Sequence, residues 1–499
     1  MLPGRVDPSR IVPVDGLLGA SPACRKASGR AEKSTSGAST RQGRGAPVDE
    51  NGHDPERKNQ LDVQSRNSPG DSATVVRRRR TITLGKWSIL ALLVLATIVN
   101  LMDRQLPFIM AEPIKAEFDL SDTELGMLGG IGFSLVYALA ALPLARLADR
   151  RSRRLVLAGS IAVWSLCTAA GGLATNYFQL LASRAGVAFG EAGAAPATHS
   201  LVADLFPPRQ RAFALGLTSA GISLGVLVGM AVGGYALQWM DWRTALMLAA
   251  IPGALLSLIF VAFVQEPPRH GARDSTPPAL RTACARLWGQ RSFFWMVAGC
   301  MLCTFSSAGS AAFGASFFMR VHGSTLATAG LINGVAVGLA GALGGILSGY
   351  LADRLSLRDR RWVLWLAAIS MLLRTPLYIA AWFATDVATA TILLVTSGVL
   401  TGGYLPMTYT ATQAIADARM RAFASAVTQL AVNLLGGVVG PIVVGIMSDA
   451  LEPRLGVLSI AYALAIAGAA ALVAVACYWR ASKFYLSDIA DHDLRNDKE

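Results

Sequence analysis

The sequence contains little charge and little cysteine for its length. Charged residues make up 15% of its 499 residues and hydrophobic residues 53%, whereas soluble domains contain about 25% charged residues. This shortage excludes an ordinary soluble enzyme. The six cysteines include the pair Cys300 and Cys303, but no second pair and no histidine at ligand spacing accompanies them. We therefore interpret the cysteines as small buried residues and expect no metal and no cofactor.

Motifs for enzymatic chemistry and for direct ATP use are also missing. The sequence has no G-x-x-x-x-G-K-[ST] loop, no nucleophile with an accompanying base and no set of metal ligands. These absences disfavour an ATP-driven pump and a membrane enzyme. The formal net charge of +13 does not indicate a nucleic-acid partner, because the basic residues lie mostly in short loops between apolar stretches.

Long apolar stretches dominate the chain from Trp87 onward. Many of them approach the length of about 20 residues that crosses the hydrocarbon core of a bilayer. They predict an all-α polytopic membrane protein with twelve transmembrane helices. The predicted helices are 86–111, 126–148, 155–174, 177–203, 212–237, 242–264, 292–319, 327–352, 362–383, 388–414, 422–448 and 457–481.

The composition divides the chain into five parts. Residues 1–85 are rich in Gly, Ser, Asp, Arg and Pro without periodicity, which predicts a disordered cytoplasmic tail. A Pro- and Arg-containing linker, 266–291, separates two predicted six-helix bundles, 86–265 and 292–482. Residues 483–499 are expected to form a cytoplasmic C-terminal tail.

Two short motifs recur at nearly the same offset. The sequence Leu-Ala-Asp-Arg occurs at 147–150 and 351–354, and Arg-Ala-Phe-Ala occurs at 211–214 and 421–424. Each pair occupies the same place within its half. The repeat predicts two pseudo-symmetric bundles, the arrangement of transporters whose halves rock about a central site.

Basic residues distinguish the two sides of the membrane. If the N-terminus is cytoplasmic, the cytoplasmic loops carry 18 arginines, whereas the outer loops carry four basic residues, Lys115, Arg243, Arg320 and Arg454. The positive-inside rule therefore predicts an inner-membrane protein with both termini in the cytoplasm.

The loop after the second helix resembles a motif of the major facilitator superfamily, G-x-L-a-D-r-x-G-r-r. Here the ten residues run from Ala145 to Arg154; Ala145 and Ser152 replace the two glycines, while Asp149 and the basic cluster remain. The second copy keeps Gly349. The resemblance covers 86–482 and implies a transporter that works by alternating access.

A second, more specific set of residues in the N-terminal half is similar to bacterial spinster-like transporters. The matching residues are Asn100, Asp103, Arg104, Gln105, Ala111–Lys115, Leu120–Gly126, Arg184, Gly190–Gly193, Pro196, His199–Leu201 and Phe206–Pro208. Animal members of that family are linked to lysophospholipid and sphingoid-phosphate export, and bacterial relatives to proton-coupled transport. The C-terminal half matches only at superfamily level.

Few ionisable residues lie within predicted helices, and each is a candidate site residue because its insertion costs about 2.5–3.5 kcal/mol. Asp103 and Arg104 lie on the first helix, Arg184 and Glu191 on the fourth. Asp103 and Arg184 lie roughly 12 and 10 Å below the outer ends of their helices. We therefore expect Asp103 to pair with Arg184, while Arg104 and Glu191 complete the cluster.

This cluster has two interpretations. In one, Glu191 and Asp103 couple transport to protons, and Arg104 and Arg184 hold an anionic headgroup. In the other, the four residues form a fixed ionic network that docks the first helix on the fourth. Arg374, beside Pro376 on the ninth helix, is expected to reach carbonyls that the proline leaves free.

The repeated loop motifs predict a conformational latch on the cytoplasmic side. Asp149 and Arg150 are expected to approach Arg421 at the start of the eleventh helix. The second copy, Asp353 and Arg354, is expected to approach Arg211 at the start of the fifth. A carboxylate at a helix N-terminus is stabilised by about 0.3–1 kcal/mol. The alternative is that these charges serve membrane topology only.

The C-terminal half offers its cavity aromatic and neutral polar side chains, among them Tyr404 and Thr408 as candidate substrate contacts. A charged half facing an apolar half suits an amphiphile. We therefore predict a proton-coupled secondary transporter, not an enzyme, for an anionic or amphiphilic, lysolipid-like substrate, with protons and membrane lipids as further partners. The alternatives are a small organic-acid transporter, a drug-like efflux pump, or a receptor without transport.

Overall fold

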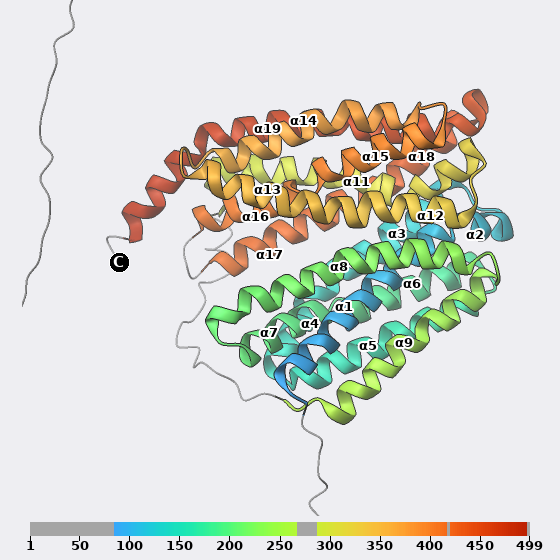
Figure 1. Ribbon diagram of the computed structural model, residues 1–499, viewed down its shortest axis with the longest axis horizontal. Helices are drawn as coiled ribbons and strands as arrows, with labels where there is room; N and C mark the ends of the chain where they lie inside the picture. Colours follow the sequence, from blue (N-terminus) through green and yellow to red (C-terminus); the bar gives the residue numbers. More distant parts are fainter. Residues whose placement is uncertain (1–83, 267–286, 417–419, 497–499) are drawn as a thin grey trace, which may run out of the picture. The chain divides into compact units, whose positions relative to one another are not determined.

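The computed structural model describes residues 84–266, 287–416 and 420–496, and within them every regular element is a helix (Figure 1). Most of the predicted tail, 1–85, and of the predicted linker, 266–291, lies outside the described residues. We name the end of the bundle that holds Ser121 and Asp241 the outer end. The opposite end, which holds Ser152 and Phe206, is the inner end, predicted to face the cytoplasm.

The N-terminal half, residues 86–265, contains six membrane-crossing segments built from ten elements. These are α1 (Lys86–Ile109), α2 (Ala111–Phe118), α3 (Asp122–Gly129), the π-helical η1 (Gly130–Leu135), α4 (Val136–Arg150), α5 (Arg153–Gly172), α6 (Tyr177–Glu191), α7 (Ala194–Leu205), α8 (Pro208–Ala236) and α9 (Trp242–Phe263).

The described C-terminal half repeats that plan. Its elements are α11 (Arg291–His322), α12 (Leu326–Gly334), the π-helical η2 (Val335–Leu339), α13 (Ala340–Ser356), α14 (Trp362–Trp382), α15 (Val387–Thr401), α16 (Tyr404–Ile415), α17 (Arg421–Ala431), the π-helical η3 (Val432–Val438), α18 (Val439–Leu455), the 3₁₀ turn η4 (Gly456–Leu458) and α19 (Ser459–Asn496).

The twelve predicted helices are confirmed, although two are interrupted. Ten stretches of the described residues are long and apolar enough to span a membrane; one of them joins the eleventh and twelfth helices, and the fourth helix, which carries Arg184 and Glu191, is not among them. The fourth helix breaks at Ala192–Gly193 and the tenth at Gly402–Gly403. The two breaks lie 210 residues apart, the offset of the Arg-Ala-Phe-Ala repeat, which supports the internal symmetry.

Several helix ends differ from the prediction for identifiable reasons. The second segment begins at Asp122 rather than 126, because Ser121 and Glu124 form a capping box. The short helix α2 fills a connection that was predicted as loop. At the other end of the chain, α19 continues through most of the predicted tail, 483–499, to Asn496.

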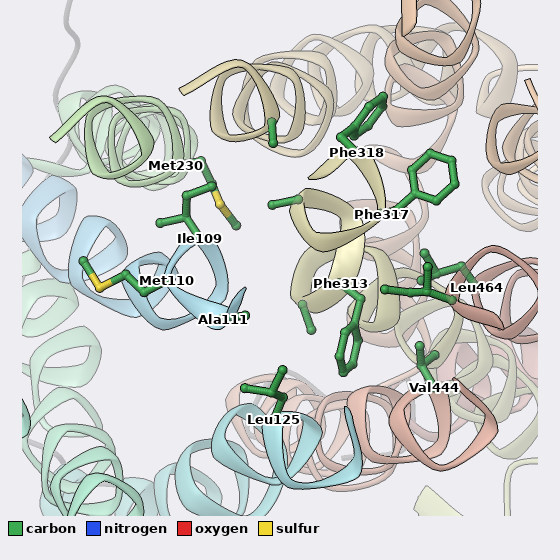
Figure 2. Close-up of a cluster of buried hydrophobic side chains, with 14 of the residues drawn as sticks. Ile109, Met110, Ala111, Leu125, Met230, Phe313, Phe317, Phe318, Val444 and Leu464 are labelled. Atoms are coloured by element: carbon green, nitrogen blue, oxygen red, sulfur yellow. The ribbon is translucent and has the colours of Figure 1, made fainter. Parts of the chain in front are cut away.

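A large hydrophobic cluster joins the two halves near the outer end. Figure 2 shows Phe313, Phe317 and Phe318 of α11 in this cluster, together with Ile109 of α1 and Met230 of α8. Phe317 and Phe318 are fully buried. Because the cluster draws on both halves, its burial holds the outer ends together.

Contacts between the halves concentrate at this end, where α3 packs on α18 and α8 packs on α12. The helix backbones approach closely: a Cβ added to Gly126 would lie 2.5 Å from the carbonyl oxygen of Pro441, and one added to Gly330 would lie 2.2 Å from that of Met230. In contrast, α4, α7, α16 and α17, toward the inner end, pack chiefly within their own halves. The two halves are therefore closed at the outer end and separate at the inner end.

Candidate functional site

Asp103 of α1 is 1% exposed, in the middle of the N-terminal half. Its Oδ2 atom accepts a hydrogen bond of 2.7 Å from the hydroxyl of Thr168 on α5. Its Oδ1 atom has no hydrogen-bond partner in the described part of the chain. A buried carboxylate with one free oxygen is costly to keep charged, so this group is suited to binding a proton.

Arg104, the next residue, forms an ion pair with Glu191 at the end of α6. Its Nε and Nη2 atoms donate to Oε2 of Glu191 at 3.0 and 2.7 Å. The guanidinium also lies over the rings of Phe133 and Tyr137, at 4.7 and 4.9 Å from their centroids. The Glu191 side chain is inaccessible, whereas that of Arg104 is 28% exposed. Arg104 therefore connects the buried carboxylate to the space between the halves.

Arg184, on α6, does not form the direct ion pair with Asp103 that we expected. It is 4% exposed and lies 5.3 Å from the centroid of Phe133. Charge interactions link it to Asp103 and Glu191, but among the described residues it forms no direct ion pair and no hydrogen bond. The expected direct pair of Asp103 with Arg184 is therefore absent in this conformation, because Asp103 binds Thr168 and Glu191 binds Arg104.

A cavity of about 140 Å³ lies between the two halves beside these arginines. Residues of α1, α3, η1 and α6 form its charged and aromatic side; residues of α11, η3 and α18 form a small, apolar side. Its lining residues are Arg104, Pro107, Phe108, Leu128, Gly129, Phe133, Ser134, Arg184, Ala308, Ala311, Gly437 and Pro441. Two guanidinium groups thus face a small uncharged wall across the cavity.

An ionic network closes the outer end directly above this cavity. Arg320 of α11 binds Asp122 with two parallel hydrogen bonds of 2.7 Å, and its Nε donates to Glu112 at 2.9 Å. Lys115 and Ser448 donate to the same Asp122 carboxylate at 2.6 Å each. Because Arg320 and Ser448 belong to the C-terminal half, this outer network ties the halves together.

The network continues through the backbone. Asp449 of α18 accepts hydrogen bonds of 2.8 Å from the N–H groups of Asp122 and Thr123, so a carboxylate of one half caps a helix of the other. We did not predict this network from the sequence, although the acidic first outer loop and the basic Arg320 were visible signals. Pairing them required knowing that α3 and α11 meet.

The predicted inner latch is not assembled in the part that the structure describes. Arg211, in the first turn of α8, donates to the carbonyl of Phe206 just before that helix, and Asp353 is exposed. Arg354 lies over the ring of Tyr350, 4.9 Å from its centroid. The side chains of Asp149, Arg150 and Arg421 lie outside the described residues. The separation of the inner ends explains why Asp353 does not reach Arg211.

Tyr404 and Thr408 do not line the cavity. The hydroxyl of Tyr404 lies 3.1 Å from that of Thr304, and Thr408 is fully buried with its hydroxyl 2.7 Å from that of Tyr478. Both side chains thus point into the interior of the C-terminal half. The periodicity of the helix was visible in the sequence, but the direction of its cavity face was not.

Arg374 is buried within the same interior, 1% exposed. Its Nη1 atom donates to Ser306 Oγ at 2.5 Å, and its guanidinium lies 3.9 Å from the centroid of Tyr378. It therefore contacts a hydroxyl of α11 and an aromatic face of α14, rather than the carbonyls that we expected Pro376 to free.

Glu266 fastens the inner end of the N-terminal half. Its carboxylate accepts hydrogen bonds from Ser152 Oγ at 2.7 Å and from the N–H groups of Arg153 and Arg154 at 2.9 Å, at the start of α5. Burial alone would raise the pKa of Glu266, but the hydrogen bonds from Ser152, Arg154 and Arg153 outweigh it and hold the pKa below its usual value.

Comparisons with known proteins agree with this architecture. A family model described as Major Facilitator Superfamily matches residues 93–441 and 318–488. An MFS-type efflux pump of Mycolicibacterium smegmatis (strain ATCC 700084 / mc(2)155) is 36% identical over 412 residues, covering 81% of this chain and 94% of the relative. A hexuronate transporter of Bacillus subtilis (strain 168) is 29% identical over 196 residues, covering 39% of this chain and 46% of the relative.

A solved structure extends the comparison to the spinster group. It is that of a bacterial homolog of the human lysosomal transporter Spinster, in an inward-facing and unoccupied conformation. It matches with a TM-score of 0.74 and 28% identity and covers 81% of this chain and 98% of that chain. The spinster-like resemblance of the sequence is thereby confirmed.

Proposed function

We propose that this chain, which belongs to the major facilitator superfamily and is therefore a membrane transporter and not an enzyme, couples the movement of an anionic, amphiphilic molecule to protons. Its proposed location is the inner membrane, with both termini cytoplasmic. One observation carries the proposal: Arg184 lines the cavity between the halves without an ion-pair partner among the described residues, beside the Arg104–Glu191 pair.

The unpaired arginine supports an anionic substrate. A buried guanidinium without a direct ion pair is unfavourable in the membrane, and an anionic group in the cavity would relieve that cost. The cavity of about 140 Å³ has room for a small headgroup, whereas sites that enclose a whole drug-sized ligand measure roughly 300–1,000 Å³. An amphiphile would therefore place its charged group here and its apolar part between the separated inner ends.

The Arg104–Glu191 pair supports coupling to protons. A substrate anion that takes Arg104 leaves Glu191 unpaired, and an unpaired carboxylate buried in the membrane is far more stable when protonated. Asp103, whose Oδ1 atom has no partner among the described residues, offers a second proton site on α1. Substrate and proton thus bind to the same cluster and affect each other's affinity reciprocally.

Alternating access would exchange two sets of contacts. In this conformation the outer network of Asp122, Arg320 and Asp449 holds the outer ends together. We propose that the inner latch of Asp149, Arg150, Asp353, Arg354, Arg211 and Arg421 forms when the outer network breaks. Each set is then favourable in one state only, as a two-state transporter requires.

Proteoliposome transport tests the proposal. A labelled lysophospholipid is offered with and without an imposed pH gradient, to the wild type and to Glu191→Gln. We expect gradient-driven flux in the wild type and its loss in the variant. Flux that ignores the gradient and survives Glu191→Gln would overturn the proton role, and the absence of lipid flux would overturn the lipid-like substrate.

A small organic acid or a drug-like molecule is the second candidate substrate, and the modest volume of the cavity favours it. The relatives named an MFS-type efflux pump and a hexuronate transporter are consistent with this alternative. The same vesicles distinguish the candidates when a sugar acid and a cationic dye replace the lipid. Arg184 would bind the acid, whereas a cationic dye gains nothing from it.

A further inference from the structure

The C-terminal half has little charge near the cavity, but one face of its eleventh segment is polar. Ser425, Gln429 and Asn433 follow each other at intervals of four residues on α17 and η3, and Gly437, four residues further, lines the cavity. Residues at this spacing lie on the same side of a helix. The polar face therefore leads from the inner end of the protein to the cavity.

The neighbouring α16 adds two residues to this face. The Tyr409 hydroxyl donates to Gln429 Oε1, and Gln413 Nε2 donates to Ser425 Oγ at 3.4 Å. Gln429 Nε2 donates in turn to Asn433 Oδ1 at 3.0 Å. We call these five residues, Gln413, Ser425, Tyr409, Gln429 and Asn433, the polar track.

The polar track faces the other half of the protein and not the interior of its own half. Gln413 and Gln429 are exposed, whereas Ala424, Thr428 and Val432, on the adjacent face of the same segment, are 0–3% exposed. Tyr409 lies on the side of the track near Tyr137 of α4, whose ring centroid is 4.9 Å from the Arg104 guanidinium. The track is therefore near the aromatic residues that flank Arg104.

The hydrogen bonds of the track run in one direction. The Tyr409 hydroxyl donates to Gln429, and Gln429 donates to Asn433. The Nδ2 group of Asn433, at the end of this chain, donates to no described atom. Hydroxyl groups match such a surface, because an amide and a hydroxyl each donate and accept hydrogen bonds. An unbranched acyl chain would gain nothing from it.

We infer that the substrate is a hydroxylated anion: its charged group binds Arg184 and Arg104, and its hydroxyl groups bind the polar track of the C-terminal half. This inference rests on the proposed function and specifies the substrate of the same site. Two sources share the chemistry, the glycerol backbone of an anionic lysolipid and the carbon chain of a sugar acid.

Matched substrate pairs test the inference in proteoliposomes. One pair is a lysophosphatidic acid and its analogue without the free glycerol hydroxyl; the other is glucuronate and adipate, an acid of similar length without hydroxyls. We expect the wild type to favour the hydroxylated member of one pair by about tenfold in kcat/KM, the effect of one or two hydrogen bonds. The pair that shows the preference identifies the source.

Variants assign the preference to the polar track. Gln429→Leu and Asn433→Leu should reduce the preference to nearly one, while Thr428→Val, a change at a buried residue on the adjacent face of the same helix, should leave it unchanged. Gln413→Leu, at the exposed inner end of the track, provides a second variant if either central change prevents folding. Melting temperature and size-exclusion profiles verify the fold of each.

The outcomes separate this inference from the proposed function. Equal rates within both pairs, or a preference that persists in Gln429→Leu and Asn433→Leu, would overturn the inference. If gradient-driven flux still depends on Glu191 in those same vesicles, the proposed function stands although the inference of a hydroxylated substrate fails. If no anion responds to the pH gradient in any variant, the proposed function itself fails.

Discussion

The two halves share a fold but differ in where they hold charge. The N-terminal half places Asp103, Arg104, Arg184 and Glu191 in a cluster at the cavity. The described C-terminal half holds its buried Arg374 away from the cavity, between Ser306 and Tyr378, and presents neutral groups instead. One half is thus suited to binding protons and anions, and the other to recognising uncharged groups. Duplication supplied the scaffold twice, and the site uses the copies differently.

The largest effect is expected at the centre of the charged half. Glu191→Gln should lower gradient-driven transport roughly a thousandfold, within the range seen when a proton-transferring group is removed. Proteoliposome uptake at fixed substrate concentration measures it. Glu452→Gln, an exposed carboxylate of the other half, is the control and should change nothing. Similar losses in both variants would show that the proposed division between the halves does not exist.

The next largest effect is expected when the outer network that joins the two halves is broken. Asp122→Asn removes the charge that Arg320 and Lys115 share, and breaking such a buried pair costs roughly 3 kcal/mol. The outer end should open more often, so that a cysteine introduced at Ala311 becomes reactive to a membrane-impermeant thiol reagent added outside. Asp119→Asn, in the same loop, should not change this reactivity. Unaltered labelling in Asp122→Asn would show that the outer network does not hold the closed state.

A smaller effect is expected from the unpaired arginine. Arg184→Gln should raise KM for an anionic substrate by roughly tenfold, because one charged hydrogen bond is lost, while Arg184→Lys should restore most of the affinity. Initial rates over a range of substrate concentrations separate KM from kcat. A KM that is the same in all three proteins would remove Arg184 from substrate binding and leave it a structural charge of the N-terminal half.

The inner ends of the halves offer a matched pair of helix caps. Glu266 caps α5 in the N-terminal half, and Asp488 binds Ser292 at the start of α11 in the other. Glu266→Gln should cost about 1 kcal/mol, a typical value for a helix cap. The pKa of Glu266 is lowered in the folded protein, so its contribution is present above the unfolded-state value of about 4.3 and decreases as the pH falls through the folded value.

Thermal unfolding in detergent between pH 3.5 and 7 measures this contribution. The difference in melting temperature between wild type and Glu266→Gln should be greatest near pH 7 and shrink toward pH 3.5. A difference that does not vary with pH would mean that the shape of the side chain, and not its charge, supports α5.

The smallest effect is expected at Arg374, a buried charge of the C-terminal half that lies away from the cavity. Arg374→Met should change stability by less than about 1 kcal/mol, because replacing a buried charge by an apolar side chain of similar size leaves no partner charge behind. KM should stay constant. A large loss of transport in a well-folded Arg374→Met protein would show that the C-terminal half also uses charge, and the comparison would fail.

The sequence predicted more of the fold than of the site. Apolar length identified twelve segments, and the composition of short motifs identified the repeat, because both properties are local. The breaks at Gly193 and Gly403 and the π-helical segments were not predicted, since a hydropathy pattern continues across a local change of helix geometry. The Arg104–Glu191 pair agrees with the cluster that was expected, whereas the partner of Asp103 is Thr168, a neutral residue without any signal in the sequence.

The sequence by itself determined that this protein is a membrane transporter of two related halves, because the bilayer restricts what each apolar stretch can do. Only the tertiary structure decided which face of each helix meets the cavity. Thr408 and Tyr409 are neighbours in the chain, yet one is buried against Tyr478 and the other bonds to Gln429 on the polar track. A helix turns 100° per residue, so its packing against other helices, which depends on contacts distant in the chain, selects the residue that can bind a substrate.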